Sequence, residues 1–154
     1  MGYYQKYQKY KFKYLNLLSL NQSGGMMSPL DIEQQLKIVK GLKNVQHNEM
    51  TREQYYYICE AAVKNNGLEL EYVNTHKIMD FNLYNNICTL AVNNNSDALQ
   101  HIVNNIISPD QYYEICKLAI KKDKTALKYV DKFELADIKY EKINNYESLV
   151  NLAK

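Results

Sequence analysis

The sequence lacks the features that most directly assign a location or a reaction to a protein. No apolar run approaches the roughly 18 residues of a membrane-spanning helix, and no charged-then-apolar secretory signal opens the chain. We therefore expect a protein without a membrane span that is kept in a cytosol-like compartment. No Gly-rich phosphate loop, Gly-x-Ser-x-Gly elbow or His-Glu-x-x-His metal motif is present, so we predict a non-enzymatic protein without a cofactor.

Closely spaced cysteine pairs are also missing, although the chain has three cysteines, Cys59, Cys88 and Cys116. Zinc sites are typically built from pairs such as Cys-x-x-Cys. A disulfide needs Cα atoms within about 7 Å, whereas packed helix axes lie about 8–10 Å apart. Because each cysteine occupies the same slot of a repeated segment, we predict buried, free thiols that pack as small apolar side chains, with no metal site.

A repeated segment is what the sequence does contain. The stretch 54–73 returns at 83–103 and again at 111–130, and the first and third copies agree at about half of their positions. In each copy apolar residues recur at i, i+3, i+4, i+7 and i+8, the spacing of one buried face of an α-helix. These residues are Tyr55, Ile58, Cys59, Ala62 and Val63; Tyr84, Ile87, Cys88, Ala91 and Val92; and Tyr112, Ile115, Cys116, Ala119 and Ile120. Each copy therefore predicts a long amphipathic helix and not a strand.

Helix boundary signals stand at matching places in the copies. Thr51 and Ser108 each precede a glutamine by three residues, the spacing of a capping box, and Asp80 can cap the middle copy. We expect the long helices to end within 65–67, 93–95 and 122–124, with a left-handed C-cap of the kind that asparagine and glycine tolerate. A short second helix follows in each copy, with these apolar anchors: Leu70 and Val73; Leu99, Ile102 and Val103; Leu127 and Val130.

Together the copies predict an all-α fold, a short α-helical repeat stack of solenoid-like helix–turn–helix units of about 28 residues. A unit of this size cannot bury enough apolar surface alone, so neighbouring units must share one core. The middle copy departs from the others: Asn85-Asn86 stands in place of the second tyrosine, and one extra residue precedes Ala98. Residues 41–45 predict a shortened first unit, and helices within 137–154 close the other end.

The N-terminal segment 1–25 differs from the predicted repeat domain, 26–154. Up to Tyr14 it contains four lysines and no acidic residue, and its tyrosines recur at heptad-like spacing. Gly24-Gly25 ends this predicted amphipathic helical arm as a linker, and Ser28-Pro29 opens a helix through Lys40. The arm can dock on its own protein or self-associate, contact nucleic acid or another anionic surface through residues 1–14, or serve as a targeting tag.

Candidate partner-binding residues follow from these patterns. The core positions recur while the outward positions of the long helices differ between copies, as expected of a scaffold that presents a binding surface. Exposed tyrosines are common anchors in protein interfaces, although filling between helices would also explain them. The candidates are Tyr3, Tyr7, Tyr10, Tyr14, Lys6, Lys9, Lys11, Lys13, Tyr56 and Tyr113.

The segment Tyr-x-x-Ile-Cys-x-x-Ala-Val/Ile-Lys/Asn, followed by Ala-Leu-Lys-Tyr-Val, resembles a helical repeat of uncharacterised function in mimivirus-like giant DNA viruses and some protists. The opening YYQKYQKYKFKYLNLLSLNQSGG is similar to a Tyr/Lys-rich leader ending in Gly-Gly on giant-virus proteins. The resemblance implies viral origin, a place in the infected host cytoplasm or the virion, and no active-site residues. We expect a protein-interaction or structural protein with a viral or host protein partner. The alternative is a nucleic-acid-associated protein that binds through its basic arm.

Overall fold

The computed structural model describes residues 41–45, 47, 48, 50–131 and 142–154. Every regular element within these ranges is helical and none is a strand, so the predicted all-α class is confirmed for this part of the chain. The predicted arm at 1–25 and the predicted helix at 28–40 lie outside the described residues. The boundary between the two predicted domains therefore stays a prediction.

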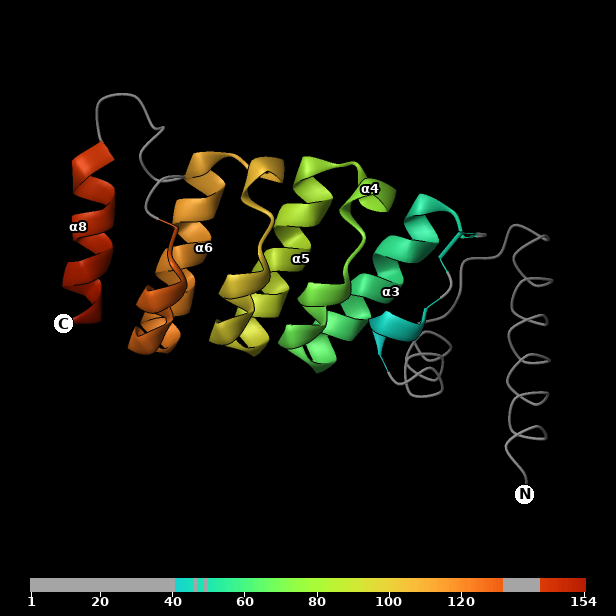
Figure 1. Cartoon of the computed structure of the whole chain (residues 1–154), viewed down its shortest axis with the longest axis horizontal. Helices are drawn as coiled ribbons and strands as arrows, with labels where there is room; N and C mark the ends of the chain where they lie inside the picture. Colours follow the sequence, from blue (N-terminus) through green and yellow to red (C-terminus); the bar gives the residue numbers. More distant parts are fainter. Residues whose placement is uncertain (1–40, 46, 49, 132–141) are drawn as a thin grey trace, which may run out of the picture.

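Long helices form one layer of the structure (Figure 1). They are α3 (Arg52–Asn65), α5 (Phe81–Asn94) and α6 (Pro109–Lys122), each of 14 residues. The helices run in the same direction, and α5 packs against α3 on one side and α6 on the other. The apolar stripe predicted for each helix is buried in full and belongs to one continuous core. Each buried Ile, Val or Leu of that core stabilises the fold by roughly 1.5–3 kcal/mol.

The predicted starts of the three long helices are confirmed. The Thr51 hydroxyl accepts from the Gln54 N–H at 3.2 Å, and the Gln54 side chain accepts from the Thr51 N–H at 2.9 Å. Ser108 and Gln111 form the same reciprocal capping box, with Pro109 at the first helical position. Asp80 caps α5 without a glutamine partner. Its carboxylate accepts hydrogen bonds from two backbone N–H groups of the first turn. These bonds satisfy donors that a helix N-terminus otherwise leaves unpaired.

The long helices end where the sequence predicts, but the predicted left-handed C-cap is wrong. The residues that follow the helices, Asn66, Asn95 and Asp123, have φ of −146°, −140° and −144° and are extended. Each side chain accepts a hydrogen bond from the backbone N–H two residues further along the chain. The same residue thus ends one helix and caps the start of the next, which explains why Asn or Asp stands there.

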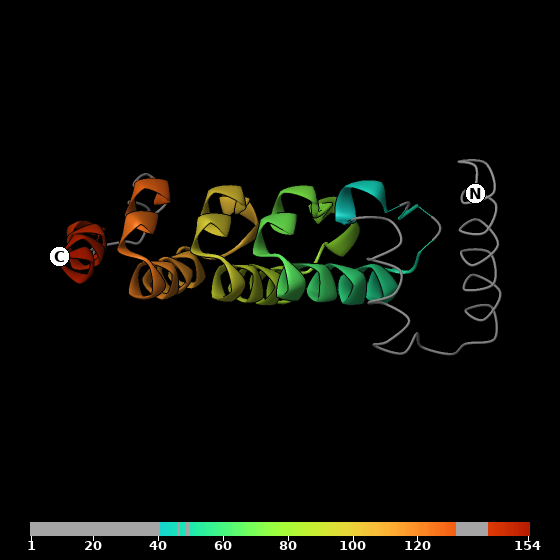
Figure 2. The same ribbon diagram turned by 90° about the horizontal axis from the view of Figure 1, so that it is seen from below.

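Short 3-10 helices form the second layer, and Figure 2 shows them as a row beside the long helices. They are η1 (Leu42–Asn44), η2 (Gly67–Tyr72), η3 (Ser96–His101) and η5 (Lys124–Tyr129). The predicted anchors Leu70, Leu99 and Ile102 are buried, as is Leu42 of the predicted shortened first unit. Val103 is not an anchor, because its side chain is 41% exposed. Ile102 takes the place that Val130 takes after η5, since both end their 3-10 helix with the same backbone bond.

Tyrosine hydroxyls connect the two layers. The hydroxyls of Tyr55, Tyr84 and Tyr112 each accept a hydrogen bond from the backbone N–H located 19 residues later, at 2.8, 3.0 and 2.8 Å. The chain is extended there, on its way back from the 3-10 helix to the next long helix. Each tyrosine thus buries its ring in the core, and its hydroxyl pairs with a backbone N–H just after the 3-10 helix of the second layer.

The prediction of an extra residue before Ala98 in the middle copy is wrong. The spacing from the long helix to the 3-10 helix is the same in all copies, because the tyrosine bonds always span 19 residues. The difference lies in the connections, which contain α4 (Thr75–Ile78) and η4 (Asn104–Ile106). The first connection, 74–80, is one residue longer than the second, 103–108. It includes Met79, which has a left-handed φ of 43° and closes α4.

Polar side chains join the long helices at the edge where they end. Asn94 at the end of α5 donates to the Lys64 carbonyl and accepts from the Gly67 N–H, both at 2.8 Å. At the end of α6, the Lys122 ammonium group donates to the backbone carbonyl groups of Asn93 and Asn94 at the end of α5. Carbonyl groups at a helix C-terminus carry partial negative charge, so an ammonium group suits this place.

The C-terminal helix α8 (Lys142–Ala153) packs against α6 and η5. Its Leu149 is buried completely, which agrees with the prediction that this end of the chain is closed by a helix. Tyr146, Leu149, Val150 and Ala153 repeat the spacing of Tyr112, Ile115, Cys116 and Ala119. In Figure 1, α8 continues the row of long helices beyond α6.

Candidate interaction surface

The predicted contact tyrosines of the long helices are only partly available. Tyr56 is half-buried, and its hydroxyl accepts a hydrogen bond from the Asn86 side chain at 2.6 Å. Tyr113 is also half-buried, with the Lys117 ammonium nitrogen 5.2 Å from its ring centre. Tyr57 is more exposed, at 40%, and contacts the ring of Tyr56 edge-on. The other predicted contact residues, Tyr3, Tyr7, Tyr10, Tyr14, Lys6, Lys9, Lys11 and Lys13, lie outside the described residues.

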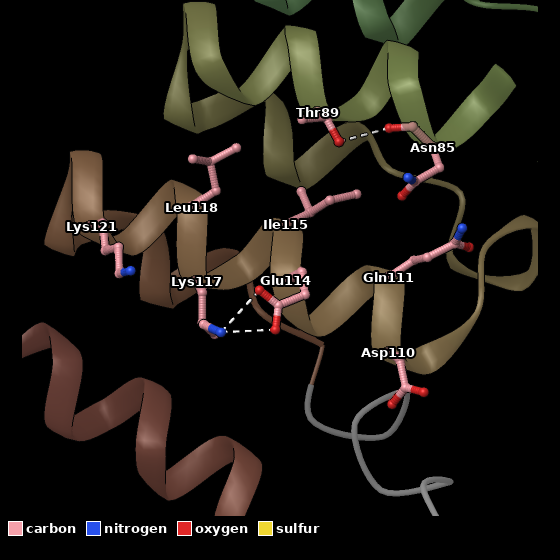
Figure 3. Close-up of a pocket in the computed structure, with 9 residues that line it drawn as sticks. All are labelled: Asn85, Thr89, Asp110, Gln111, Glu114, Ile115, Lys117, Leu118 and Lys121. Atoms are coloured by element: carbon pink, nitrogen blue, oxygen red, sulfur yellow. Dashed lines mark hydrogen bonds and ion pairs between the residues drawn. The ribbon is translucent and has the colours of Figure 1, made fainter. Parts of the chain in front are cut away.

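A groove of about 500 Å³ lies between α5 and α6 on their outer face (Figure 3). Asn85 and Thr89 line it from α5, and Glu114, Ile115, Lys117 and Leu118 line it from α6. Ile115 is buried and Leu118 is half-buried, while Glu114 is exposed. An apolar floor with polar groups around it is the usual composition of a site that binds a side chain or a small molecule.

Asn85 contributes an unpaired polar atom to the wall of this groove. Its side-chain oxygen Oδ1 is buried and has no hydrogen-bond partner among the described residues. The neighbouring Thr89 hydroxyl cannot serve it, since it donates to the Asn85 backbone carbonyl at 2.8 Å. Buried oxygens of this kind are nearly always paired in proteins, so an unpaired one marks a place where a donor is missing.

Charge at the groove is balanced locally. The Lys117 ammonium group donates to both carboxylate oxygens of Glu114, at 2.8 and 2.9 Å. This hydrogen bond raises the pKa of Lys117. Lys121 and Asp110 complete the lining with one charge of each sign. The groove therefore attracts neither strongly acidic nor strongly basic ligands, and its selectivity must come from shape and hydrogen bonding.

The cysteines belong to the core and not to a reactive site. Cys59, Cys88 and Cys116 are free and buried, as predicted. Burial raises the pKa of each thiol to about 12, against an ordinary value of 9.0, although the hydroxyl of the tyrosine one turn earlier opposes the shift. Such thiols stay protonated at neutral pH, and only a thiolate is a good nucleophile or metal ligand. Among the described residues no cluster of His, Cys, Asp and Glu is arranged to hold a metal ion.

Sequence reasoning placed Tyr56 and Tyr113 in the interaction surface but missed the groove. The signal was present, because Asn85 stands where the other copies have Tyr56 and Tyr113. What could not be read from the sequence is that this position faces the next long helix, so that losing the ring leaves a space. Lys117 and Leu118 belong to the groove for the same reason, from the opposite wall.

Comparison of the chain with protein-family models, curated proteins and solved structures gives no match. The resemblance to a giant-virus helical repeat therefore stays a prediction. In the described part of the chain, no helix combines the length and apolar character needed to cross a membrane.

Proposed function

We propose that the chain is a short α-helical repeat stack that acts through protein–protein contact, as a non-enzymatic interaction or structural protein. The observation that carries the proposal is a contrast between the inside and the outside of the long helices. Inside, the tyrosine bonds and buried stripes recur at offsets of 29 and 28 residues. Outside, equivalent positions carry different residues, such as Tyr56 and Asn85. A constant core with a varied surface is how repeat proteins present a selective binding face.

The polar groups of the core, its thiols and tyrosine hydroxyls, support the proposal because they serve the packing of the fold. The thiols are protonated, and the tyrosine hydroxyls are held by backbone N–H groups. The resemblance to the giant-virus repeat extends the proposal to a setting: a virion or virus-factory component, or a factor that contacts a host protein. It also supplies the class of partner, a viral or host protein.

Nucleic acid binding through the basic arm is the competing function, favoured by the four lysines and interleaved tyrosines of residues 1–14. A variant with Lys6, Lys9, Lys11 and Lys13 replaced by glutamine separates the two. Affinity purification from the source, with wild-type and variant chains as bait, should recover the same protein partner in both cases. Recovery of nucleic acid by the wild-type chain alone, and its release as salt is raised, would favour the competing function.

A further inference from the structure

The structure contains its own example of what fills the space between two neighbouring long helices. One residue after the buried tyrosine of each helix stands an outward position: Tyr56, Asn85 or Tyr113. In α3 the Tyr56 ring packs against the core and reaches across to α5, where its hydroxyl meets Asn86 at 2.6 Å. A tyrosine side chain with a bonded hydroxyl is therefore the native occupant of the space between α3 and α5.

The equivalent space between α5 and α6 has no such occupant. Asn85 lacks the ring, and a groove of about 500 Å³ lies there. Glu114 of α6 lines the groove and is the counterpart of Asn86, the residue that meets the tyrosine hydroxyl between α3 and α5. In Figure 3, Ile115 and Leu118 point from α6 toward α5, which carries Asn85, and the Glu114 carboxylate is turned toward Lys117. The polar groups have changed in kind, because Asn86 donates to a hydroxyl whereas a carboxylate accepts from one.

We propose that the groove between α5 and α6 binds a tyrosine side chain of the partner protein, in the place that Tyr56 takes between α3 and α5. This inference rests on the proposed function and names the chemistry that the partner presents. The ring packs on Ile115 and Leu118. Its hydroxyl donates to Glu114 or, after a small rotation of the amide, to the unpaired Asn85 oxygen. Phenylalanine fits the same space but has no hydroxyl to donate to either acceptor, so the groove selects tyrosine.

The direct test uses p-cresol, which is the tyrosine side chain alone, and toluene, which lacks the hydroxyl. Both are titrated into the isotope-labelled full chain while amide resonances are followed by NMR. We expect saturable shifts confined to the groove, including the Asn85 side-chain amide, with p-cresol binding at least about tenfold more tightly than toluene, a difference of about 1.4 kcal/mol. Equal binding of the two compounds would overturn the selectivity for tyrosine, and no saturable binding would overturn the site.

Two substitutions complete the test. Asn85→Tyr fills the groove with an internal ring and should abolish p-cresol binding, whereas Asn93→Tyr, the same change at an exposed position on the same helix, should leave it intact. Tyr56→Asn should open a second groove between α3 and α5 and add a second p-cresol site near Asn86. If Tyr56→Asn fails to fold, Asn85→Tyr still decides the question. The fold already accommodates a tyrosine at the equivalent positions of the other two long helices, 56 and 113. Binding that survives Asn85→Tyr would refute the site without affecting the proposed function, which is judged by partner recovery.

Discussion

Replacing Tyr84 with phenylalanine tests whether the buried hydroxyls hold the two layers together. Tyr84 is 1% exposed, and its hydroxyl accepts from the Val103 N–H at 3.0 Å. Phenylalanine keeps the ring in the core and removes the hydroxyl, which is the acceptor of the Val103 N–H and a hydrogen-bond partner of the Cys88 thiol. The Val103 N–H then loses its protein partner in the folded state, whereas in the unfolded chain it bonds to water in both proteins. The folded state is therefore the one that is destabilised.

The size of the loss follows from the exposure of the donor. A buried donor left without a partner costs about 1–3 kcal/mol. Val103 is 41% exposed and its N–H bond to Tyr84 is only partly buried, so water approaches this segment. We therefore expect the lower part of the range, a loss of about 1–1.5 kcal/mol in the free energy of unfolding. Tyr55→Phe and Tyr112→Phe should cost the same within error, because their hydroxyls make the same bond at 2.8 Å.

Urea unfolding followed by far-ultraviolet circular dichroism measures this loss, with an unchanged m-value expected. Hydrogen exchange at the Val103 amide should become faster in Tyr84→Phe, because its acceptor is gone. Tyr57→Phe is the matched control: its side chain is 40% exposed, and the change should fall within about 0.5 kcal/mol of wild type. If Tyr84→Phe matches wild-type stability, or if Tyr57→Phe costs as much, the hydroxyls do not link the layers.

Further predictions concern alkali, close packing and the contact between long helices. The pKa of each buried thiol is about 12 against 9.0 for an ordinary thiol, so the unfolded chain loses these protons first. Stability is fully present below pH 9 and falls as the pH rises toward 12. At pH 10 the loss is about 1.4 kcal/mol per thiol, and urea midpoints that stay constant from pH 7 to 10 would contradict it. Gly67→Ala should destabilise by about 1–3 kcal/mol in urea unfolding, because a Cβ there collides with the backbone oxygen of Ala91. Ser96→Ala, at the equivalent position of the next 3-10 helix, is the control and should cost clearly less. Asn94→Ala removes the acceptor of the Gly67 N–H and should cost about 1–2 kcal/mol by the same measurement, whereas Asn93→Ala should be near neutral.

The buried helix faces could be predicted because they depend on neighbours along the chain. Apolar residues three and four positions apart share a helix face whatever surrounds them, so the stripe from Tyr84 to Val92 needed no knowledge of the fold. The capping boxes at Thr51 and Ser108 are equally local, since each bond spans three residues. The predicted all-α class follows from these two signals together.

The helix ends and the groove required the tertiary structure. Asn66 tolerates a left-handed conformation, but the chain must turn at once into the second layer, and an extended residue achieves that turn. Val103 looked like an anchor because valine is apolar. The contribution of Val103 to the fold is its backbone N–H, which donates to the hydroxyl of Tyr84, 19 residues earlier in the chain. No local pattern reports a bond of that span.

Sequence alone thus established which residues form the long helices, where those helices start and which faces they bury, because periodicity and capping act within a few residues. The packing of one helix on the next decided the rest. It turned the change from tyrosine to asparagine at position 85 into a groove, left the Asn85 oxygen without a partner and required glycine at position 67. These features depend on which side chains meet across two helices, and residues about 28 positions apart meet only when the chain has folded.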